Sequence, residues 1–306
     1  MSKKIIFMGT PTFSVPILKS LHESNYTIEA VFTQPPKKKS RGQKIEKSPV
    51  HLESIKYDIP VRYPNKLDNE DDFNFIKNAK VKYVIVVAYG QIIPKKMLNL
   101  PNILFLNIHA SLLPKWRGAA PIQRSIIEMD NSTGISIMKI EPKLDAGPYM
   151  LQESIKIEND DNSATLSKKL SILSSKLIIN CLDLLKNNNA KFTEQDENQA
   201  TYANKIEKKD SEINWNIPAK KLIAKINGLN PAPGVWFRHY KTRLKIIQAQ
   251  EVNRVGKAGE VLENDLTIGC KEKAIKILLI QKEGKRVLNV KSFLTGYIIK
   301  KGEMLT

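Results

Sequence analysis

The chain has 306 residues, of which 42% are hydrophobic, and it carries a formal net charge of +18. This length suffices for about two domains that each bury a core, and no apolar run is long enough for a helix to cross a bilayer. The surplus of positive charge favours a polyanionic partner, most simply a nucleic acid, although a codon usage rich in Lys, Asn and Ile would give the same surplus.

The first 187 residues alternate short apolar strands with helices, which is typical of a doubly wound, mostly parallel α/β sheet. The first strand ends in Gly9-Thr10-Pro11, which lacks the glycine spacing of a dinucleotide-binding turn. The expected strands cover 4–8, 27–33, 81–88, 103–108, 134–140 and 149–157, the last two at an edge of the sheet. The expected helices cover 12–23, 49–57, 71–78, 119–129 and 164–186, with a further one beginning near Lys95. This order predicts a Rossmann-like fold.

Residues 188–208 are polar and aperiodic, a composition that predicts a linker. Beyond them we expect a helix over 218–228 and short strands over 243–251, 259–262, 266–270 and 274–281, which predict a small, open OB-like β-barrel. Residues 188–306 carry a net charge of +9, the same as residues 1–187 but in a shorter segment. The sequence therefore predicts an α/β domain over 1–187, a linker over 188–208, and a densely basic β-domain over 209–306.

Neither the cysteines nor the histidines predict a disulfide or a metal site. Cys181 and Cys270 are single and distant, and the four histidines include no paired ligands. Because the first strand begins by Lys4, there is no room for a signal or transit peptide. We therefore expect a reduced, cytoplasmic monomer that uses no metal and does not bind a membrane.

A polar pair stands at the end of the expected strand 103–108. Asn107 and His109 are two residues apart, so their side chains lie on the same face of an extended strand. The Asn107 amide can donate a hydrogen bond to an oxygen, and the His109 imidazole can hold or pass a proton near neutral pH. A turn and a helix follow directly, which is where open α/β sheets place a ligand crevice. In isolation, the same pattern is as well explained by a buried, hydrogen-bonded histidine.

The segment that begins with this pair is N-I-H-A-S-L-L-P-K-W-R-G-A-A-P-I-Q. It resembles, without gaps, the signature of the folate-dependent formyltransferases, and most closely of the branch that formylates initiator methionyl-tRNA. The resemblance covers nearly the whole chain and is strongest over 80–147. It implies a formyltransferase domain over 1–187 and a tRNA-binding domain over 209–306. It also implies catalytic roles for Asn107, His109 and Asp145, the last in a K-L-D-A-G segment that matches the family's L-D-x-G motif.

The resemblance implies transfer of the formyl group of 10-formyltetrahydrofolate to the α-amine of methionine on initiator tRNA, for translation initiation. Attack by the amine creates a tetrahedral oxyanion, which Asn107 and His109 can stabilise as hydrogen-bond donors. Asp145 can orient the imidazole and move a proton from the amine toward the leaving N10. Since an α-amine titrates near about 7.7–8.0 and the neighbouring ester lowers that value, no strong base, metal or covalent intermediate is required.

The same resemblance places folate in the crevice, with residues 87–90 and the 140–145 loop receiving the pterin. Backbone hydrogen bonds and apolar walls suit a flat heterocycle. Taken alone, the S-L-L-P tetrapeptide need do no more than end a strand. The residues that the resemblance implies in folate binding are Val87, Ala88, Tyr89, Gly90, Ser111, Leu112, Leu113 and Pro114.

Segment 34–48 contains six basic residues and one acidic residue, a net charge of +5. Two prolines and a glycine disfavour a helix, and long loops in compact domains are commonly functional. The segment resembles the basic insertion by which members of this branch recognise initiator tRNA, with Arg41-Gly42 the best match; the alternative is a solvated charged loop. The contacts that we expect with tRNA phosphates or base edges come from Lys37, Lys38, Lys39, Arg41 and Lys44.

Two other functions stay open from the sequence. A folate formyltransferase that acts on a small amine, such as a glycinamide nucleotide or an amino sugar, would not need the basic loop or the basic C-terminal domain. A nucleic-acid-binding module with an inactive α/β domain would not need Asn107, His109 and Asp145 together. The residues favour an enzyme with a tRNA substrate over both alternatives.

Overall fold

The computed structural model describes residues 3–39 and 44–306, and the chain is organised in two units. The first unit comprises Met1–Gly118, Gly134–Ile155 and Ser167–Tyr202. The second unit comprises Ala119–Thr133, Lys156–Leu166 and Ala203–Thr306. Much of the polar segment expected as a linker, up to Tyr202, therefore belongs to the first unit, where Thr193 pairs with Tyr149.

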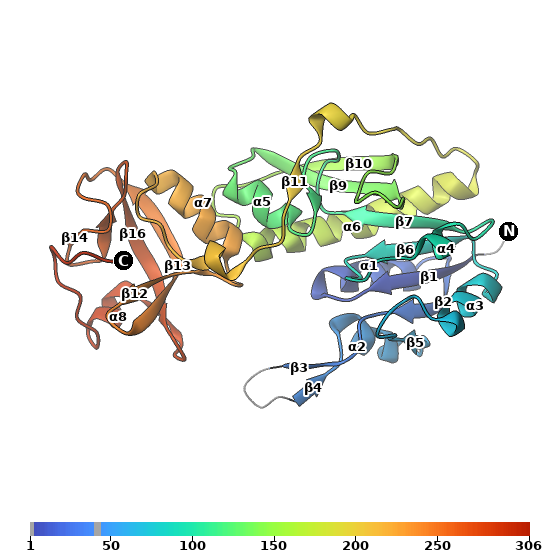
Figure 1. The fold of residues 1–306 in the computed structure, drawn as a ribbon, viewed down its shortest axis with the longest axis horizontal. Coiled ribbons are helices and arrows are strands. Elements are labelled where there is room, and N and C mark those ends of the chain that lie inside the picture. The colour runs from blue at the N-terminus through green and yellow to red at the C-terminus, as the bar shows by residue number, and fades with distance from the viewer. Residues whose placement is uncertain (1–2, 40–43) are drawn as a thin grey trace. The chain divides into compact units, whose positions relative to one another are not determined.

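A seven-stranded sheet lies at the centre of the first unit, in the order β10-β9-β7-β6-β1-β2-β5 (Figure 1). The five strands from β7 to β5 run parallel to their neighbours, and β9 runs antiparallel to β7. The predicted mostly parallel sheet is confirmed. Its strands are β1 (Lys4–Gly9), β2 (Thr27–Phe32), β5 (Val61–Arg62), β6 (Tyr83–Val87), β7 (Leu104–His109), β9 (Ser132–Lys139) and β10 (Tyr149–Lys156).

The expectation that both β9 and β10 lie at the edge is wrong for β9. This strand lies between β7 and β10, and six of its eight residues are buried. Its run T-G-I-S-I-M lacks polar alternation, as a strand covered on both faces requires. β5, which has only two residues, is too short to leave a pattern and is absent from the predicted strands.

Apolar side chains cover both faces of the parallel strands. In β1, Ile6 and Met8 belong to a core cluster on one face, while Ile5 and Phe7 alternate with them, and all four are fully buried. This double burial explains why the K-I-I-F-M run is apolar throughout rather than alternating.

Two helices of the first unit begin at capping residues. The Ser48 hydroxyl accepts a hydrogen bond from the backbone N–H of His51 at 3.0 Å, and the Asn69 side chain accepts one from Asp72 at 2.8 Å. Each such cap stabilises a helix start by about 1 kcal/mol. The predicted helices are confirmed as η1 (Thr12–Ser14) with α1 (Val15–His22), α2 (Pro49–Lys56), α3 (Glu70–Asn78), α4 (Lys95–Leu98), α5 (Pro121–Ile127) and α6 (Ser163–Lys186).

The basic segment 34–48 is not a plain loop, which corrects the sequence expectation. β3 (Lys37–Lys39) and β4 (Lys44–Glu46) form an antiparallel hairpin that projects from the sheet in Figure 1. Lys37 is directly paired with Glu46 across the hairpin, and opposite charges at such positions stabilise strand pairing. Arg41 lies outside the described residues.

The second unit is built on an antiparallel sheet in the order β12-β13-β16-β15-β14, with β17 paired to β16. The predicted small antiparallel β-domain is confirmed. β12 is absent from the predicted strands because its residues follow directly on a proline-rich turn. The strands are β12 (Val235–His239), β13 (Thr242–Val252), β14 (Val261–Glu263), β15 (Thr267–Gly269), β16 (Ala274–Lys282) and β17 (Val287–Asn289). The remaining elements of the chain are α7 (Ala219–Leu229), α8 (Val290–Leu294), β8 (Arg117–Gly118), β11 (Tyr202–Ala203), η2 (Glu197–Gln199) and η3 (Lys208–Ser211).

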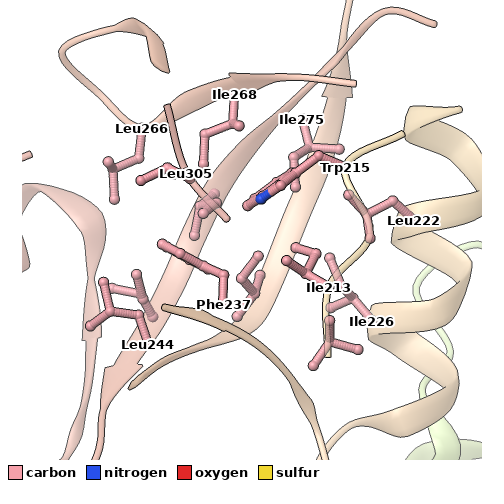
Figure 2. Close-up of a cluster of buried hydrophobic side chains, with 14 of the residues drawn as sticks. Ile213, Trp215, Leu222, Ile226, Phe237, Leu244, Leu266, Ile268, Ile275 and Leu305 are labelled. Carbon is pink, nitrogen blue, oxygen red and sulfur yellow. The ribbon is translucent and has the colours of Figure 1, made fainter. Parts of the chain in front are cut away.

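Figure 2 shows the hydrophobic cluster at the core of the second unit. The rings of Trp215 and Phe237 pack edge to face with their centroids 5.5 Å apart. Leu222 and Ile226 reach the cluster from α7, and both are fully buried. Burying a side chain of this size stabilises a fold by about 1.5–3 kcal/mol, so the cluster holds α7 on the sheet.

Within the part of the chain that the structure describes, no helix has the length and apolarity that a bilayer crossing needs.

Candidate active site

β7 delivers two polar side chains to one face of the first unit's sheet. Phe105, Asn107 and His109 are every second residue of the strand, so their side chains share one face. Phe105 belongs to the core cluster on that face. His109 is 5% exposed and Asn107 is half-buried. Asn107 is in register with Val86 of β6 and Met138 of β9. Neighbouring strands on both sides thus fix the backbone of this pair, and the predicted shared face is confirmed.

Asp145 lies in the turn between β9 and β10. Its φ is +46°, in the left-handed region that Asp tolerates better than most residues. A backbone hydrogen bond of 2.9 Å from Lys139 to Pro148 closes the turn. A Cβ on Gly147 would lie 2.1 Å from the carbonyl oxygen of Lys139. The glycine of K-L-D-A-G is therefore required because two backbone segments approach closely there.

The turn brings Asp145 to the end of β7, where the three predicted catalytic side chains meet. Asp145 Oδ1 accepts a long hydrogen bond from Asn107 Nδ2 at 3.4 Å. Asp145 Oδ2 lies 3.6 Å from Nδ1 of His109 and accepts a hydrogen bond from the backbone N–H of Gly118 at 2.9 Å. An amide, an imidazole and a carboxylate from two distant segments therefore converge.

The contacts of His109 assign its protons. Nε2 lies 2.9 Å from the carbonyl oxygen of Trp116, which can only accept, so Nε2 carries a hydrogen. Nδ1 faces the Asp145 carboxylate, which holds the ring in one orientation. Because 3.6 Å exceeds hydrogen-bond length, no hydrogen bond joins Nδ1 to the carboxylate, and Nδ1 can meet a ligand atom placed beside it.

A buried arginine supports this arrangement, and the sequence predictions missed it. Arg117 is 0% exposed. Its Nε and Nη2 donate to Gln195 Oε1 at 3.0 and 2.9 Å, and its Nη1 and Nη2 donate to Glu197 at 3.2 and 2.9 Å. Gln195 and Glu197 lie in the polar stretch whose composition predicts a linker. The available signal was the arginine itself, because a charge inside the apolar run K-W-R-G-A-A-P requires a buried partner.

The S-L-L-P segment is held by one serine hydroxyl and one amide. Ser136 Oγ of β9 donates to the carbonyl oxygen of Ser111 at 2.7 Å and accepts from the backbone N–H of Leu113 at 3.0 Å. Gln152 Nε2 of β10 donates to Ser136 Oγ and to the Leu113 carbonyl oxygen, both at 2.8 Å. These contacts hold the backbone of the segment that follows β7 in one conformation.

Half of the predicted folate-binding residues are buried, backbone included, and have almost no surface that a ligand could contact in this conformation. They are Val87, Tyr89, Ser111 and Leu113. The other half are at least partly accessible. Two of these residues, Ala88 and Gly90, have positive φ angles. These four are Ala88, Gly90, Leu112 and Pro114.

The hairpin that carries the predicted tRNA contacts is tied to this region at its base. Gln34 Nε2 donates to the carbonyl oxygen of Gly90 at 2.8 Å, and Lys37 Nζ donates to Gln34 Oε1. Lys37 is exposed. Of the other predicted contacts, the backbone of Lys38 and Lys39 lies in β3 and that of Lys44 in β4. The basic hairpin therefore begins beside the segment expected to bind folate.

Comparisons with known proteins identify the family of the chain. The family described as formyl transferase matches residues 3–182, and the formyl transferase C-terminal domain matches residues 205–298. The methionyl-tRNA formyltransferase of Pelagibacter ubique (strain HTCC1062) is 53% identical over 308 residues, which cover 100% of this chain and 99% of that one.

Two solved structures have a similar fold. One is WlaRD, a sugar 3N-formyltransferase in the presence of dTDP and 5-N-formyl-THF, with a TM-score of 0.67 and 19% identity, over 92% of this chain and 98% of that one. The other is the methionyl-tRNA formyltransferase from Clostridium thermocellum, with a TM-score of 0.55 and 19% identity, over 81% of this chain and 93% of that one. At these identities the likeness concerns the fold alone.

We expect the contacts of Glu197 to make the stability of the protein sensitive to acid. Hydrogen bonds from Arg117 and then Lys143 lower the pKa of the Glu197 carboxyl from 4.5 to about 2. A carboxyl whose pKa is lower in the folded state stabilises the fold above its ordinary pKa, and this stabilisation is lost as the pH falls from about 4.5 toward 2. Thermal melting should therefore find Glu197→Gln less stable than the parent at pH 6, with a difference that shrinks steadily between pH 5 and pH 3. A difference independent of pH would contradict this account of the contact.

Proposed function

The chain belongs to the methionyl-tRNA formyltransferase branch of the formyl transferase family, and we propose that Asn107, His109 and Asp145 transfer a formyl group from 10-formyltetrahydrofolate to the α-amine of initiator methionyl-tRNA. The observation that carries the proposal is the convergence of these side chains at the end of β7, with Asp145 between the other two. Acyl transfer needs hydrogen-bond donors fixed in advance where the oxyanion forms. The strands on both sides of β7 meet this requirement, because they fix the backbone that carries Asn107 and His109.

In the proposed reaction the methionine amine attacks the formyl carbon, and the carbonyl oxygen becomes an oxyanion. Asn107 Nδ2 and the Nδ1–H of His109 donate hydrogen bonds to it, each worth about 2.7–4 kcal/mol of the barrier if it resembles other such donors. The bond from carbon to N10 then breaks, and the formyl group stays on the amine. The proton that the amine loses passes through Asp145 to N10, so no charge is left on either product.

We propose that folate binds against the backbone of 87–90 and 111–114. The exposed Ala88 and Gly90 offer backbone groups, and the partly accessible Leu112 and Pro114 supply apolar surface. Leu144, next to Asp145, is 62% exposed and offers a further apolar wall. The structure of WlaRD, which has a similar fold, was determined in the presence of 5-N-formyl-THF, and this supports a folate donor.

We propose that the basic hairpin binds the tRNA, through Lys37, Lys38, Lys39, Arg41 and Lys44. The net charge of +5 over 34–48 favours a polyanion, and the hairpin begins beside the donor site. With a charged tRNA and folate as substrates, we place the protein in the cytoplasm and expect it to act as a monomer.

The decisive assay offers 10-formyltetrahydrofolate together with charged initiator or elongator methionyl-tRNA. We expect formylation of the initiator, and a loss of at least about 100-fold in kcat for His109→Ala and for Asp145→Ala, because each removes a group that acts on the developing charge. Both variants should retain the circular dichroism spectrum of the parent. The matched control is Asp68→Ala, which removes an exposed carboxylate from the same unit and should leave kcat unchanged. Equal formylation of both tRNAs, or of a small amine instead, would contradict the proposed substrate.

Neutralising the hairpin should weaken tRNA binding without slowing the chemical step. Replacing Lys37, Lys38, Lys39 and Arg41 by Gln removes up to four phosphate contacts, each of which contributes about 0.7–0.9 to the salt slope of log K. We therefore expect a lower affinity for initiator tRNA, a salt slope reduced by about 3, and a kcat at saturating tRNA within about twofold of the parent.

The control for this variant neutralises four exposed lysines elsewhere in the first unit, namely Lys66, Lys77, Lys82 and Lys95. It changes the net charge equally but leaves the hairpin intact. A filter-binding titration over a range of salt concentrations compares the two. If both variants bind tRNA alike, the hairpin has no specific part in recognition.

A further inference from the structure

We propose that Gln195 is a positioning residue for formyl transfer, which holds the turn that carries Asp145 and is itself oriented by Arg117. The inference rests on the proposed function, because it assigns a role through Asp145. It also gives a mechanistic purpose to a segment whose composition predicts only a linker.

Gln195 uses both hydrogens of its amide on the backbone of the Asp145 turn. Nε2 donates to the carbonyl oxygen of Asp145 at 2.9 Å and to that of Gly147 at 2.7 Å. The side chain is buried, with 9% of the residue exposed. The two bonds therefore hold the backbone on both sides of Ala146, at Asp145 itself and two residues beyond it.

Arg117 leaves the Gln195 amide only one orientation. Oε1 of Gln195 accepts from both Nε and Nη2 of Arg117, at 3.0 and 2.9 Å. Rotating the amide by half a turn would set Oε1 against two carbonyl oxygens and the amide hydrogens against a guanidinium. All four hydrogen bonds of the Gln195 amide match a donor with an acceptor only in this orientation. The amide is therefore fixed at the centre of the network.

The segment around Arg117 also contacts the catalytic side chains directly. The backbone N–H of Gly118 donates to Asp145 Oδ2, and the Trp116 carbonyl oxygen accepts from Nε2 of His109. Residues 116–118 thus contact the Asp145 carboxylate, the His109 imidazole and, through the Arg117 side chain, Gln195. A change at Gln195 reaches the site through the position of Asp145 rather than through contact with substrate.

The turn needs this support because Asp145 has a positive φ. Such a conformation is less favourable for a non-glycine residue and persists where its surroundings fix it. Once the two bonds from Gln195 are lost, the turn can relax and the carboxylate can move away from Asn107 and His109. A misplacement of about 1 Å can cost a reaction about 100-fold in rate.

The test uses Gln195→Glu in the full-length chain. Glu keeps the length of the side chain and the partner for Arg117, but it removes both N–H donors and sets a carboxylate against two carbonyl oxygens. We expect kcat for formylation of initiator methionyl-tRNA to fall about 10- to 100-fold, with KM for each substrate within about threefold of the parent. Gln195→Asn, which keeps an amide but is one methylene shorter, serves as the second variant and should lose kcat in the same way.

The matched control is Asn69→Asp, which makes the same chemical change at a helix cap of α3. Asn69 Nδ2 donates to the Lys66 carbonyl oxygen at 3.0 Å and to Asp72 at 2.7 Å, so this variant also removes two amide donors. It should lower the melting temperature and leave kcat unchanged. If the Gln195 variants lower the melting temperature and leave kcat unchanged as well, the proposal is overturned.

A double-mutant cycle with Asp145→Asn separates positioning from a general structural effect. If Gln195 acts through Asp145, then Gln195→Glu should cost less than about threefold in kcat once Asp145 is already Asn. The same 10- to 100-fold loss in both backgrounds would overturn the inference and leave the proposed function intact. A full kcat for Asp145→Asn alone would instead overturn the proposed function, because the reaction would then not require proton transfer through Asp145.

Discussion

The carboxylate of Asp145 is the group on which the arrangement of the site depends. It accepts the backbone N–H of Gly118 and lies between the side chains of Asn107 and His109. The parallel part of the sheet supplies the two donors at the end of β7, and the antiparallel extension through β9 supplies the acid. Adding β9 beside β7 thus brings a third polar group to the end of β7 from another segment of the chain.

The distribution of charge suits a reaction between uncharged groups, one of which is carried by a large anionic substrate. The chain carries +18 overall, and the basic hairpin alone accounts for +5 over 34–48. Such a field raises the rate at which a polyanion arrives, and it acts over about 8–10 Å at physiological salt. At the site itself the Asp145 carboxylate places a negative charge beside the imidazole, within a chain that is positive overall.

Much of the fold and the catalytic pair follow from local sequence patterns. The two-residue spacing of Asn107 and His109 fixes a shared face on any strand, and the apolar runs around them identify buried strands. Asp145 came from family resemblance, since an aspartate in a turn carries little information by itself. Gln195 and Arg117 could not be predicted as partners because they are 78 residues apart and their contact exists only in the folded chain. The β3–β4 hairpin was missed for a related reason, because three-residue strands of mostly lysine leave no apolar alternation to recognise.

The most direct measurement is a crystal structure of the protein with a stable formyl-folate bound. The account predicts that the formyl oxygen lies about 2.7–3.1 Å from Asn107 Nδ2 and within hydrogen-bond reach of Nδ1 of His109, with the pterin against the 87–90 backbone. A formyl oxygen that points away from both donors, or a folate bound elsewhere on the chain, would contradict it.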